Sequence, residues 1–331
     1  MLDTATIYCF IDNSDVDKLL NAIRDYGRYY SDERIHCDKR NGSYCYCYTG
    51  LVYFGISKIY VFRRNQYLKN SLVEIKVRFK RLNEYGYCWE VAEYNEVKGA
   101  LENLNKHLMR INATAKKDLL PKLKYWEVKR VDFAVDVSIA SKREFYQILN
   151  GAKCPNGFFN ENYVGSCYMK GDMLNVNFYD KGKFLEDKNI YHLRQEKNTF
   201  RFEFQVKRKK IKKMIDKNKV CNLYNVCTKE LLNSFFKKYY SEIIGTHDFV
   251  SFKHIRNLIR QNFTHKTKTY LLKNVSYIKR RGYSSWYDGI SKDQFKRVKK
   301  YFEELGVSWI FFDSNEIEFI KNEVSEMFDM V

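Results

Sequence analysis

The segment Trp126-Glu-Val-Lys-Arg-Val-Asp-Phe-Ala-Val-Asp-Val137 has the apolar density of a buried strand, yet it carries acidic side chains. Because side chains alternate between the two faces of a strand, Asp132 and Asp136 point to one face and the apolar residues between them point mainly to the other. Two like charges on one face cost free energy unless a cation or a basic partner lies between them. The segment therefore predicts a strand with a binding site for a hard cation.

Two further apolar segments contain polar groups that a strand interior normally excludes, Asn177-Phe-Tyr-Asp-Lys181 and Phe200-Arg-Phe-Glu-Phe204. In the second segment Glu203 stands between two phenylalanines and shares a strand face with Arg201. A single acidic residue on a strand is usually a half-exposed partner in an ion pair, and this alternative stays open. Three carboxylates on neighbouring candidate strands favour a common acidic site.

Tyr179 is a candidate nucleophile. A tyrosine hydroxyl has a pKa of about 10 and attacks phosphorus poorly unless a nearby group stabilises its oxyanion. On a continuous strand Tyr179 and Lys181 share a face, so we expect the ammonium group to favour the phenolate or to neutralise a phosphate. The chain contains 27 tyrosines, and the alternative is that Tyr179 is a packed strand aromatic.

Hydrophobic periodicity predicts an α+β fold with a mixed or antiparallel sheet in the part of the chain before Lys207. The predicted strands are Ala5–Ile11, Ser43–Tyr53, Lys58–Phe62, Ser71–Phe79, Trp126–Val137, Ser166–Met169, Leu174–Tyr179 and Thr199–Val206. The predicted helices in this part are Asp15–Tyr26, Glu93–Ile111 and Ser141–Leu149.

Positive charge is concentrated in one part of the chain. The formal net charge is +19, and residues 206–300 contain 25 Lys and Arg against 6 Asp and Glu. This concentration predicts salt-sensitive contacts with phosphates, and nucleic acid is the expected polyanion. A solvated lysine-rich surface is the alternative.

The basic region also has a helical pattern. The predicted helices are Lys207–Asp216, Thr228–Ile244, Ser251–Asn262, Lys266–Arg280 and Lys292–Leu305. For the last of these, Ser291 is the predicted N-cap and Gly306 the predicted stop. We therefore expect a catalytic domain over residues 1–244 and a small, mostly helical DNA-binding domain over residues 245–331.

Other protein classes are not favoured by the sequence. No apolar run approaches the roughly 18 residues that span a bilayer, and the N-terminus lacks a secretion signal, so we expect a cytoplasmic location and no membrane partner. Nine cysteines without an export signal favour reduced thiols, and their spacing does not predict a zinc ribbon.

The ordered motifs of the chain resemble those of the replication initiators of filamentous phages, the gene II/X family, and more distantly the rolling-circle initiators of small plasmids. The motifs that carry the resemblance are Phe10-Ile-Asp-Asn13, Val73-Glu-Ile-Lys76, Arg130-Val-Asp132, Tyr179-Asp-Lys181, Arg201-Phe-Glu203, Tyr277-Ile-Lys-Arg-Arg-Gly-Tyr283 and Phe295-Lys-Arg-Val298. Each motif is short, but their order is that of the family and they span most of the chain.

The resemblance implies a nickase that cleaves one strand of origin DNA and keeps the 5′ phosphate on a tyrosine. The tyrosine of the family's Tyr-x-Lys motif corresponds to Tyr179. The resemblance also implies a Mg²⁺ or Mn²⁺ ion, with Asp132 and Glu203 as the first candidate ligands and Glu74 and Asp136 as the next. Many related nickases bind their metal through a His-hydrophobic-His motif, which this sequence lacks. We therefore expect a domain of that type with carboxylate ligands.

The expected partner is origin DNA, both duplex and single-stranded, in a bacterial host cell. Host helicase and polymerase are further expected partners, and the protein is expected to act as a monomer or dimer. The residues predicted to contact DNA are Lys207, Arg208, Lys209, Lys210, Lys279, Arg280, Arg281, Lys296, Arg297, Lys299 and Lys300. The sequence leaves open whether a second tyrosine, such as Tyr191, takes part.

Two other functions fit parts of the sequence. A non-catalytic origin-binding protein would keep the basic region and would bind DNA without nicking it. An RNA-binding protein would use the 17% aromatic content for base stacking, but the chain has no recognisable RNA-binding motif. The combination of Tyr179, Lys181, Asp132 and Glu203 favours the nickase.

Overall fold

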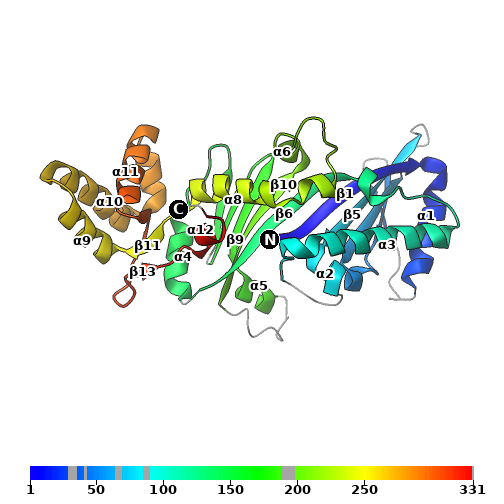
Figure 1. Cartoon of the computed structure of the whole chain (residues 1–331), viewed down its shortest axis with the longest axis horizontal. Helices are drawn as coiled ribbons and strands as arrows, with labels where there is room; N and C mark the ends of the chain where they lie inside the picture. The colour runs from blue at the N-terminus through cyan, green and yellow to red at the C-terminus, as the bar shows by residue number, and fades with distance from the viewer. Residues whose placement is uncertain are drawn as a thin grey trace. The chain divides into compact units, whose positions relative to one another are not determined.

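Figure 1 shows the computed structural model of the chain, which is an α+β protein. The structure describes residues 1–28, 36–40, 43–63, 69–84, 90–139, 141–163, 165–187 and 198–329. A large antiparallel sheet contains most of the described strands, and a smaller mixed sheet with helices forms the C-terminal part. The predicted fold class is confirmed at this level.

The chain divides into two compact units. Unit 1 comprises residues 1–135 and 203–232, and unit 2 comprises residues 136–202 and 233–331. The boundary crosses strands β6 (Glu127–Ser138) and β10 (Thr199–Lys207), so each unit contains part of both strands. The predicted division between residues 244 and 245 concerns function, and it stays a prediction.

Unit 1 contains a sheet with the strand order β2-β3-β4-β5-β1-β6-β10. Helix α3 packs beside α1 and α2 (Figure 1). Besides β6 and β10, the elements of this unit are β1 (Leu2–Asp12), α1 (Val16–Gly27), β2 (His36–Arg40), β3 (Ser43–Tyr48), β4 (Ile56–Arg63), β5 (Asn70–Arg78), α2 (Phe79–Glu84), α3 (Val97–Ala115), α6 (Arg208–Ile211) and α7 (Leu223–Val226).

The sheet of unit 1 has one apolar face, and α1 packs on it. In β1 the alternate residues Ile7 and Cys9 are buried, whereas Phe10 is 50% exposed on the other face. A Cβ atom built on Gly27 of α1 would lie 1.6 Å from the hydroxyl oxygen of Tyr48 in β3. Glycine therefore leaves room for the buried Tyr48 ring between the helix and the sheet.

Unit 2 contains a sheet with the strand order β6-β10-β9-β8-β7. A smaller sheet follows later in the chain, where β11 pairs parallel with β12 and antiparallel with β13. The elements up to this sheet are α4 (Lys142–Asn150), β7 (Phe159–Tyr163), β8 (Ser166–Lys170), β9 (Leu174–Asp180), α5 (Lys181–Asp187), α8 (Lys229–Ile243), which begins in unit 1, and β11 (Asp248–Ser251).

The C-terminal part of unit 2 consists mainly of helices (Figure 1). Helix α10 is interrupted at Gly282, whose φ of 82° is in the region that glycine reaches without strain. The elements of this part are α9 (Phe252–Asn262), α10 (His265–Gly289), α11 (Lys292–Glu304), β12 (Val307–Phe312), β13 (Phe319–Ile320) and α12 (Glu323–Met327).

Helix α11 has the predicted ends and the predicted buried face. The Ser291 hydroxyl accepts a hydrogen bond from the Gln294 backbone, and the Gln294 side chain accepts one from the Ser291 backbone. Phe295 and Val298 are buried, and Gly306 follows the helix with a φ of 70°. A capping box and a left-handed glycine therefore define this helix.

The predicted helix over Lys207–Asp216 is wrong in length. Strand β10 continues to Lys207, and the helical residues that follow are Arg208–Ile211. This stretch is rich in lysine, and Ile211 is the buried residue of α6. One buried side chain cannot hold a longer helix against the unit, because most helical stability in proteins comes from a packed apolar face.

Within the residues that the structure describes, no helix has the length and apolar character needed to cross a bilayer.

Candidate active site

Asp132 and Glu203 lie on neighbouring strands of unit 1. Asp132 is on β6 and is 2% exposed, and Glu203 is on β10 and is 6% exposed. In β10 the phenylalanines on either side of Glu203 are buried, so the strand is fixed by its apolar side chains while Glu203 points to the opposite face. The sequence alone does not show whether the two acidic strands are adjacent; in the structure β6 and β10 are neighbours in the sheet.

The surroundings of the Asp132 carboxylate disfavour its charged form. Its Oδ2 accepts hydrogen bonds from the Thr4 hydroxyl and from Nη2 of Arg130, the latter at 2.8 Å. Its buried Oδ1 has no hydrogen-bond partner among the described residues. Burial first, and then the charge of Glu203, raise the pKa of Asp132 to about 7, although Arg130 opposes the rise. The pair is therefore a place where a positive ion would relieve repulsion.

The pair meets part of the requirement of a magnesium or manganese site. Among the described residues no cluster of three or more His, Cys, Asp or Glu could hold a metal ion. Mg²⁺ at phosphate-processing sites is often held by one or two carboxylates, with water and substrate phosphate completing its ligands. Asp132, with its unpartnered Oδ1, and Glu203, which also accepts a hydrogen bond from Gln205 at 2.7 Å, fit that arrangement.

The structure does not bring Glu74 to this pair. Glu74 lies opposite Tyr8 of β1, four residues along the strand from the Thr4 that contacts Asp132. That separation is about 13 Å at the rise of a β-strand. The Glu74 carboxylate instead accepts a hydrogen bond from the Lys129 ammonium at 2.5 Å.

Asp136 lies in unit 2 and is held by two cations. Its oxygens accept hydrogen bonds from Nε and Nη2 of Arg201 at 2.7 and 2.8 Å and from the Lys181 ammonium at 3.0 Å. Burial alone would raise the pKa of Asp136, but Arg201 and Lys181 outweigh it and lower the pKa. Asp136 is therefore an ionised partner in a salt bridge, which was the alternative for these acidic residues.

Tyr179 lies in a surface cleft of unit 2 with a volume of about 500 Å³. Its ring is 5.6 Å from the ring of Phe184, measured between centroids. The residues that line the cleft are Glu161, Tyr163, Ser166, Tyr168, Lys170, Tyr179, Asp180, Lys183, Phe184 and Asp187. A cleft with aromatic rings, lysines and an accessible tyrosine can accept a nucleotide and its phosphate.

Lys181 does not share a strand face with Tyr179, and this prediction is corrected. Strand β9 ends at Asp180, whose carboxylate accepts a hydrogen bond from the Lys183 backbone at 2.9 Å and so caps α5. Lys181 is the first residue of α5, and its side chain is 3% exposed and paired with Asp136. The turn from strand to helix at Asp180 therefore breaks the alternation on which the prediction depended.

Lys183 and Lys170 are cations of the Tyr179 cleft that the sequence prediction missed. Lys183 is exposed, and Lys170 donates a hydrogen bond to Glu161 at 2.7 Å. The signal for Lys183 was Asp180, because an aspartate after a strand is a favoured helix N-cap and predicts a first turn that brings residue 183 back toward it.

The predicted DNA-contacting residues lie in three places. Lys207 ends β10 and Arg208, Lys209 and Lys210 are in α6, where Arg208 pairs with Glu127. Lys279, Arg280 and Arg281 lie in α10 just before the interruption at Gly282, and Lys296, Arg297, Lys299 and Lys300 lie in α11. Lys296, Arg297 and Lys300 are exposed, whereas Lys299 is half-buried.

Comparison with known proteins gives no assignment. No protein-family model matches this sequence, and no curated protein matches it. The resemblance to phage and plasmid initiators therefore depends on the motifs of the sequence, and it stays a prediction.

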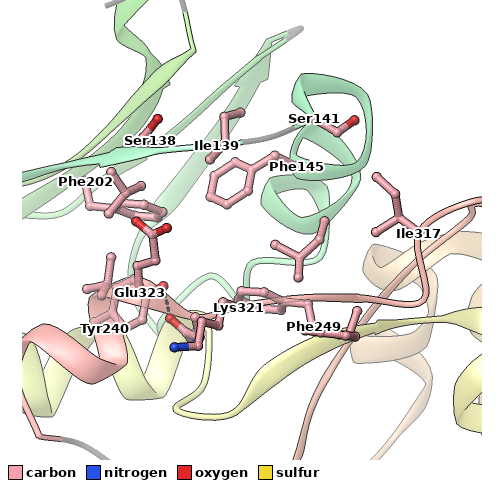
Figure 2. A pocket seen from close by; sticks show the side chains of 15 residues that line it. Ser138, Ile139, Ser141, Phe145, Phe202, Tyr240, Phe249, Ile317, Lys321 and Glu323 are labelled. Carbon is pink, nitrogen blue, oxygen red and sulfur yellow. Dashed lines mark hydrogen bonds between the residues drawn. The ribbon is translucent and has the colours of Figure 1, made fainter.

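A second cavity of unit 2 has a different character. It has a volume of about 310 Å³, and Figure 2 shows Phe145, Phe202 and Phe249 among its labelled side chains, with Lys321 and Glu323 beside them. Its lining is mainly apolar, and Lys321 is the one lysine among the described residues of the lining, which also contains Glu323. This character suits an apolar ligand better than a phosphate. The candidate Tyr191 lies outside the described residues.

Proposed function

We propose that the chain is a rolling-circle replication initiator that nicks one strand of origin DNA and joins itself to the 5′ phosphate through Tyr179. The observation that carries the proposal is the position of Tyr179 in a surface cleft lined by other tyrosines and by Lys170 and Lys183. Tyr179 with Lys181 matches the Tyr-x-Lys motif of the initiator family between the Arg130 and Arg201 motifs, as does Tyr168 with Lys170. The proposed place of action is the cytoplasm of a bacterial host.

The proposed reaction exchanges one phosphate ester for another. The Tyr179 oxygen forms a bond to phosphorus, the bond from phosphorus to the 3′ oxygen breaks, and the 3′ oxygen takes up a proton. The phenol proton leaves to a base or to solvent. Because the phosphotyrosine bond replaces a phosphodiester bond, the strand is rejoined by the reverse reaction without ATP.

The side chains of the cleft supply what a phenol requires for this attack. An ammonium group near the phenol stabilises its oxyanion and the charge on the phosphate. Lys183 lines the cleft with Tyr179, and it replaces Lys181, which is buried and paired with Asp136, as the candidate for this role. Tyr163 and Tyr168 in the same cleft offer faces on which a base can stack.

Asp132 and Glu203 are the residues that would hold a divalent cation. A bound Mg²⁺ or Mn²⁺ ion would supply Lewis-acid stabilisation of negative charge on phosphate oxygens. The chain's own contribution is to keep two carboxylates together in a buried setting, with Thr4 and Arg130 orienting Asp132.

The test is a nicking assay with supercoiled DNA of the parent replicon in the presence of Mn²⁺. Wild type is expected to give nicked circles and protein-linked DNA, and Tyr179→Phe is expected to bind DNA and give neither. Tyr168→Phe is the matched control, because it removes a hydroxyl from the same cleft, and it is expected to nick. Nicking and linkage by Tyr179→Phe at the wild-type rate would contradict the proposal.

A non-catalytic origin-binding protein is the second candidate. It is favoured by the exposed cations of α11, which provide a phosphate-binding surface without any tyrosine chemistry. This function predicts that wild type and Tyr179→Phe bind the parent DNA equally and that neither one nicks it.

A further inference from the structure

Aromatic side chains form two adjacent rows across three strands of unit 1. In the first row Tyr8 of β1 is opposite Glu74 of β5, which is opposite Tyr60 of β4. Two residues along these strands, Phe10 and Phe62 occupy the corresponding positions of the second row. We call this set the aromatic platform; its members are Tyr8, Phe10, Tyr60 and Phe62.

The platform is on the sheet face opposite α1. Its residues alternate with buried residues such as Ile7 and Val61, which form the apolar face. Phe10 is 50% exposed, and the other three rings are half-buried. The core of unit 1 therefore does not require these rings, and they offer flat apolar surfaces to a partner.

The rings are arranged in two close pairs. The ring centroids of Tyr8 and Phe10 are 5.9 Å apart, and those of Tyr60 and Phe62 are also 5.9 Å apart, with the second pair nearly parallel at 26°. Aromatic side chains on an exposed sheet face are the means by which several single-strand-binding domains stack unpaired bases.

Cations surround the platform. The Lys58 ammonium is 5.9 Å from the centroid of the Tyr60 ring, and the Arg208 guanidinium is 5.4 Å from that of Tyr8. Lys76 lies opposite Lys58 in the neighbouring row.

Two of the acidic groups near the platform are paired with cations, and Asp12, two residues beyond Phe10 on β1, is exposed. The Glu74 carboxylate between the two tyrosines pairs with Lys129 at 2.5 Å, and Glu127 pairs with Arg208. The surface therefore combines aromatic rings with the ammonium groups of Lys58 and Lys76, which are complementary to bases on a phosphate backbone.

We propose that the aromatic platform binds single-stranded DNA, with bases stacked on its rings and phosphates in contact with Lys58 and Lys76. The bases of a duplex would not stack on the rings, because they are already stacked on each other. The choice of DNA over RNA rests on the proposed function. The platform is a binding surface separate in role from Tyr179, and it holds the unpaired strand without cleaving it.

The test measures binding of a short, labelled single-stranded oligodeoxynucleotide to the full chain by fluorescence anisotropy. Phe10→Ala and Phe62→Ala are each expected to weaken binding roughly fivefold or more, and the double variant further, because each removes a stacking surface. Phe10→Trp is expected to retain binding. Lys58→Glu is expected to weaken binding and to reduce its dependence on salt concentration.

Tyr125→Ala is the matched control. Tyr125 is 63% exposed and has the Lys124 ammonium 4.9 Å from its ring centroid, but it lies outside the strands of the sheet. This variant is expected to bind as wild type does. Unfolding temperatures equal to that of wild type show that a loss of binding in the platform variants does not come from misfolding.

The outcomes separate the platform from the nicking reaction. If the Phe10→Ala, Phe62→Ala double variant binds the oligonucleotide as wild type does, the proposal that the platform binds single-stranded DNA is wrong. This holds even if the chain nicks DNA. Loss of binding in the double variant but not in Tyr125→Ala supports the platform, even in a chain that never nicks. Tighter binding of wild type to RNA of the same sequence overturns the assignment to DNA.

Discussion

Asp132 and Glu203 are buried on adjacent strands of unit 1, and the charge of Glu203 adds to the effect of burial on Asp132. Together these effects raise the pKa of Asp132 to about 7. Arg130 and Thr4 contact Asp132 without removing this effect. A fold that keeps two acids this close has a cost in stability, which a bound cation would offset.

The stability of the protein is expected to depend on the protonation of Asp132. Because folding raises the pKa of this group from 3.8 to about 7, the protonated form favours the native state, and its contribution is lost as the pH rises from about 4 to 7. This rise corresponds to at most about 4 kcal/mol. Urea unfolding at pH 5 and pH 8 is expected to show that Asp132→Asn gains stability relative to wild type at the higher pH.

Glu203→Gln is the control for this pH dependence. Removing the neighbouring charge is expected to lower the pKa of Asp132 and to move the loss of stability to lower pH. A difference in free energy of unfolding between Asp132→Asn and wild type that is the same at both pH values would contradict the account.

A divalent cation is expected to stabilise the folded protein through the same pair. Mn²⁺ or Mg²⁺ at neutral pH is expected to raise the unfolding temperature of wild type, and removal with EDTA is expected to reverse the rise, because an ion that binds only the native state stabilises it. Differential scanning fluorimetry measures this shift. An equal shift in the double variant Asp132→Asn, Glu203→Gln would exclude the pair as the binding site.

The two lysines after Tyr179 are expected to respond differently to substitution. Lys181→Met is expected to lower the free energy of unfolding by roughly 1–3 kcal/mol, because it removes one of the two cations, Lys181 and Arg201, that hold the half-buried Asp136 carboxylate. Lys183→Ala removes an exposed side chain and is expected to change stability by less than about 0.5 kcal/mol.

The rate of nicking is expected to depend on Lys183. Lys183→Ala is expected to reduce the rate of nicking roughly tenfold or more while DNA binding is kept, because a cation of the Tyr179 cleft is lost. Lys183→Arg keeps the charge and is expected to recover part of the rate. Nicking by Lys183→Ala at the wild-type rate would remove this residue from the proposed reaction.

The exposed cations of α11 are expected to bind duplex DNA. Replacing Lys296, Arg297 and Lys300 together by glutamate is expected to weaken duplex binding at least about tenfold and to reduce the slope of log K against log salt by up to roughly 3, if each contacts one phosphate. Filter binding over a range of salt concentrations measures both quantities.

The control for α11 changes the same amount of charge elsewhere. Lys98, Lys122 and Lys124 are exposed residues of unit 1, and their replacement by glutamate is expected to have a smaller effect on both quantities. An equal loss in the two triple variants would mean that net charge, rather than this helix, governs binding.

The local pattern of apolar and capping residues predicts many of the helices and strands. It did not predict the residue at which strand β9 ends and helix α5 begins. Ser291 and Gly306 were identified as the ends of α11 because caps are local signals. At Asp180 strand alternation and the capping preference of aspartate predict different structures. The cap decides the outcome, so Lys181 begins α5 and does not share a strand face with Tyr179. Strand β12 was also missed, although its six residues Val307–Phe312 are all buried and form an apolar run.

Only part of the acidic site could be predicted, because the site depends on contacts between segments that are distant in the sequence. The residues Asp132 and Glu203 could be chosen from their apolar strands, but the sequence could not show that the two strands are neighbours in the sheet. The partners of Asp136 and Glu74 could not be predicted, because strand order and register decide that Arg201 and Lys129 meet them. The cleft around Tyr179 required the same information, since β8 and α5 supply its lysines.

The most direct measurement is to isolate the protein after reaction with labelled parent DNA, digest the DNA and the protein, and find the nucleotide-bearing peptide by mass spectrometry. The account predicts a nucleotide on Tyr179 and no adduct in Tyr179→Phe. A nucleotide on another residue, or an equal adduct in the variant, would contradict the assignment of Tyr179 as the nucleophile.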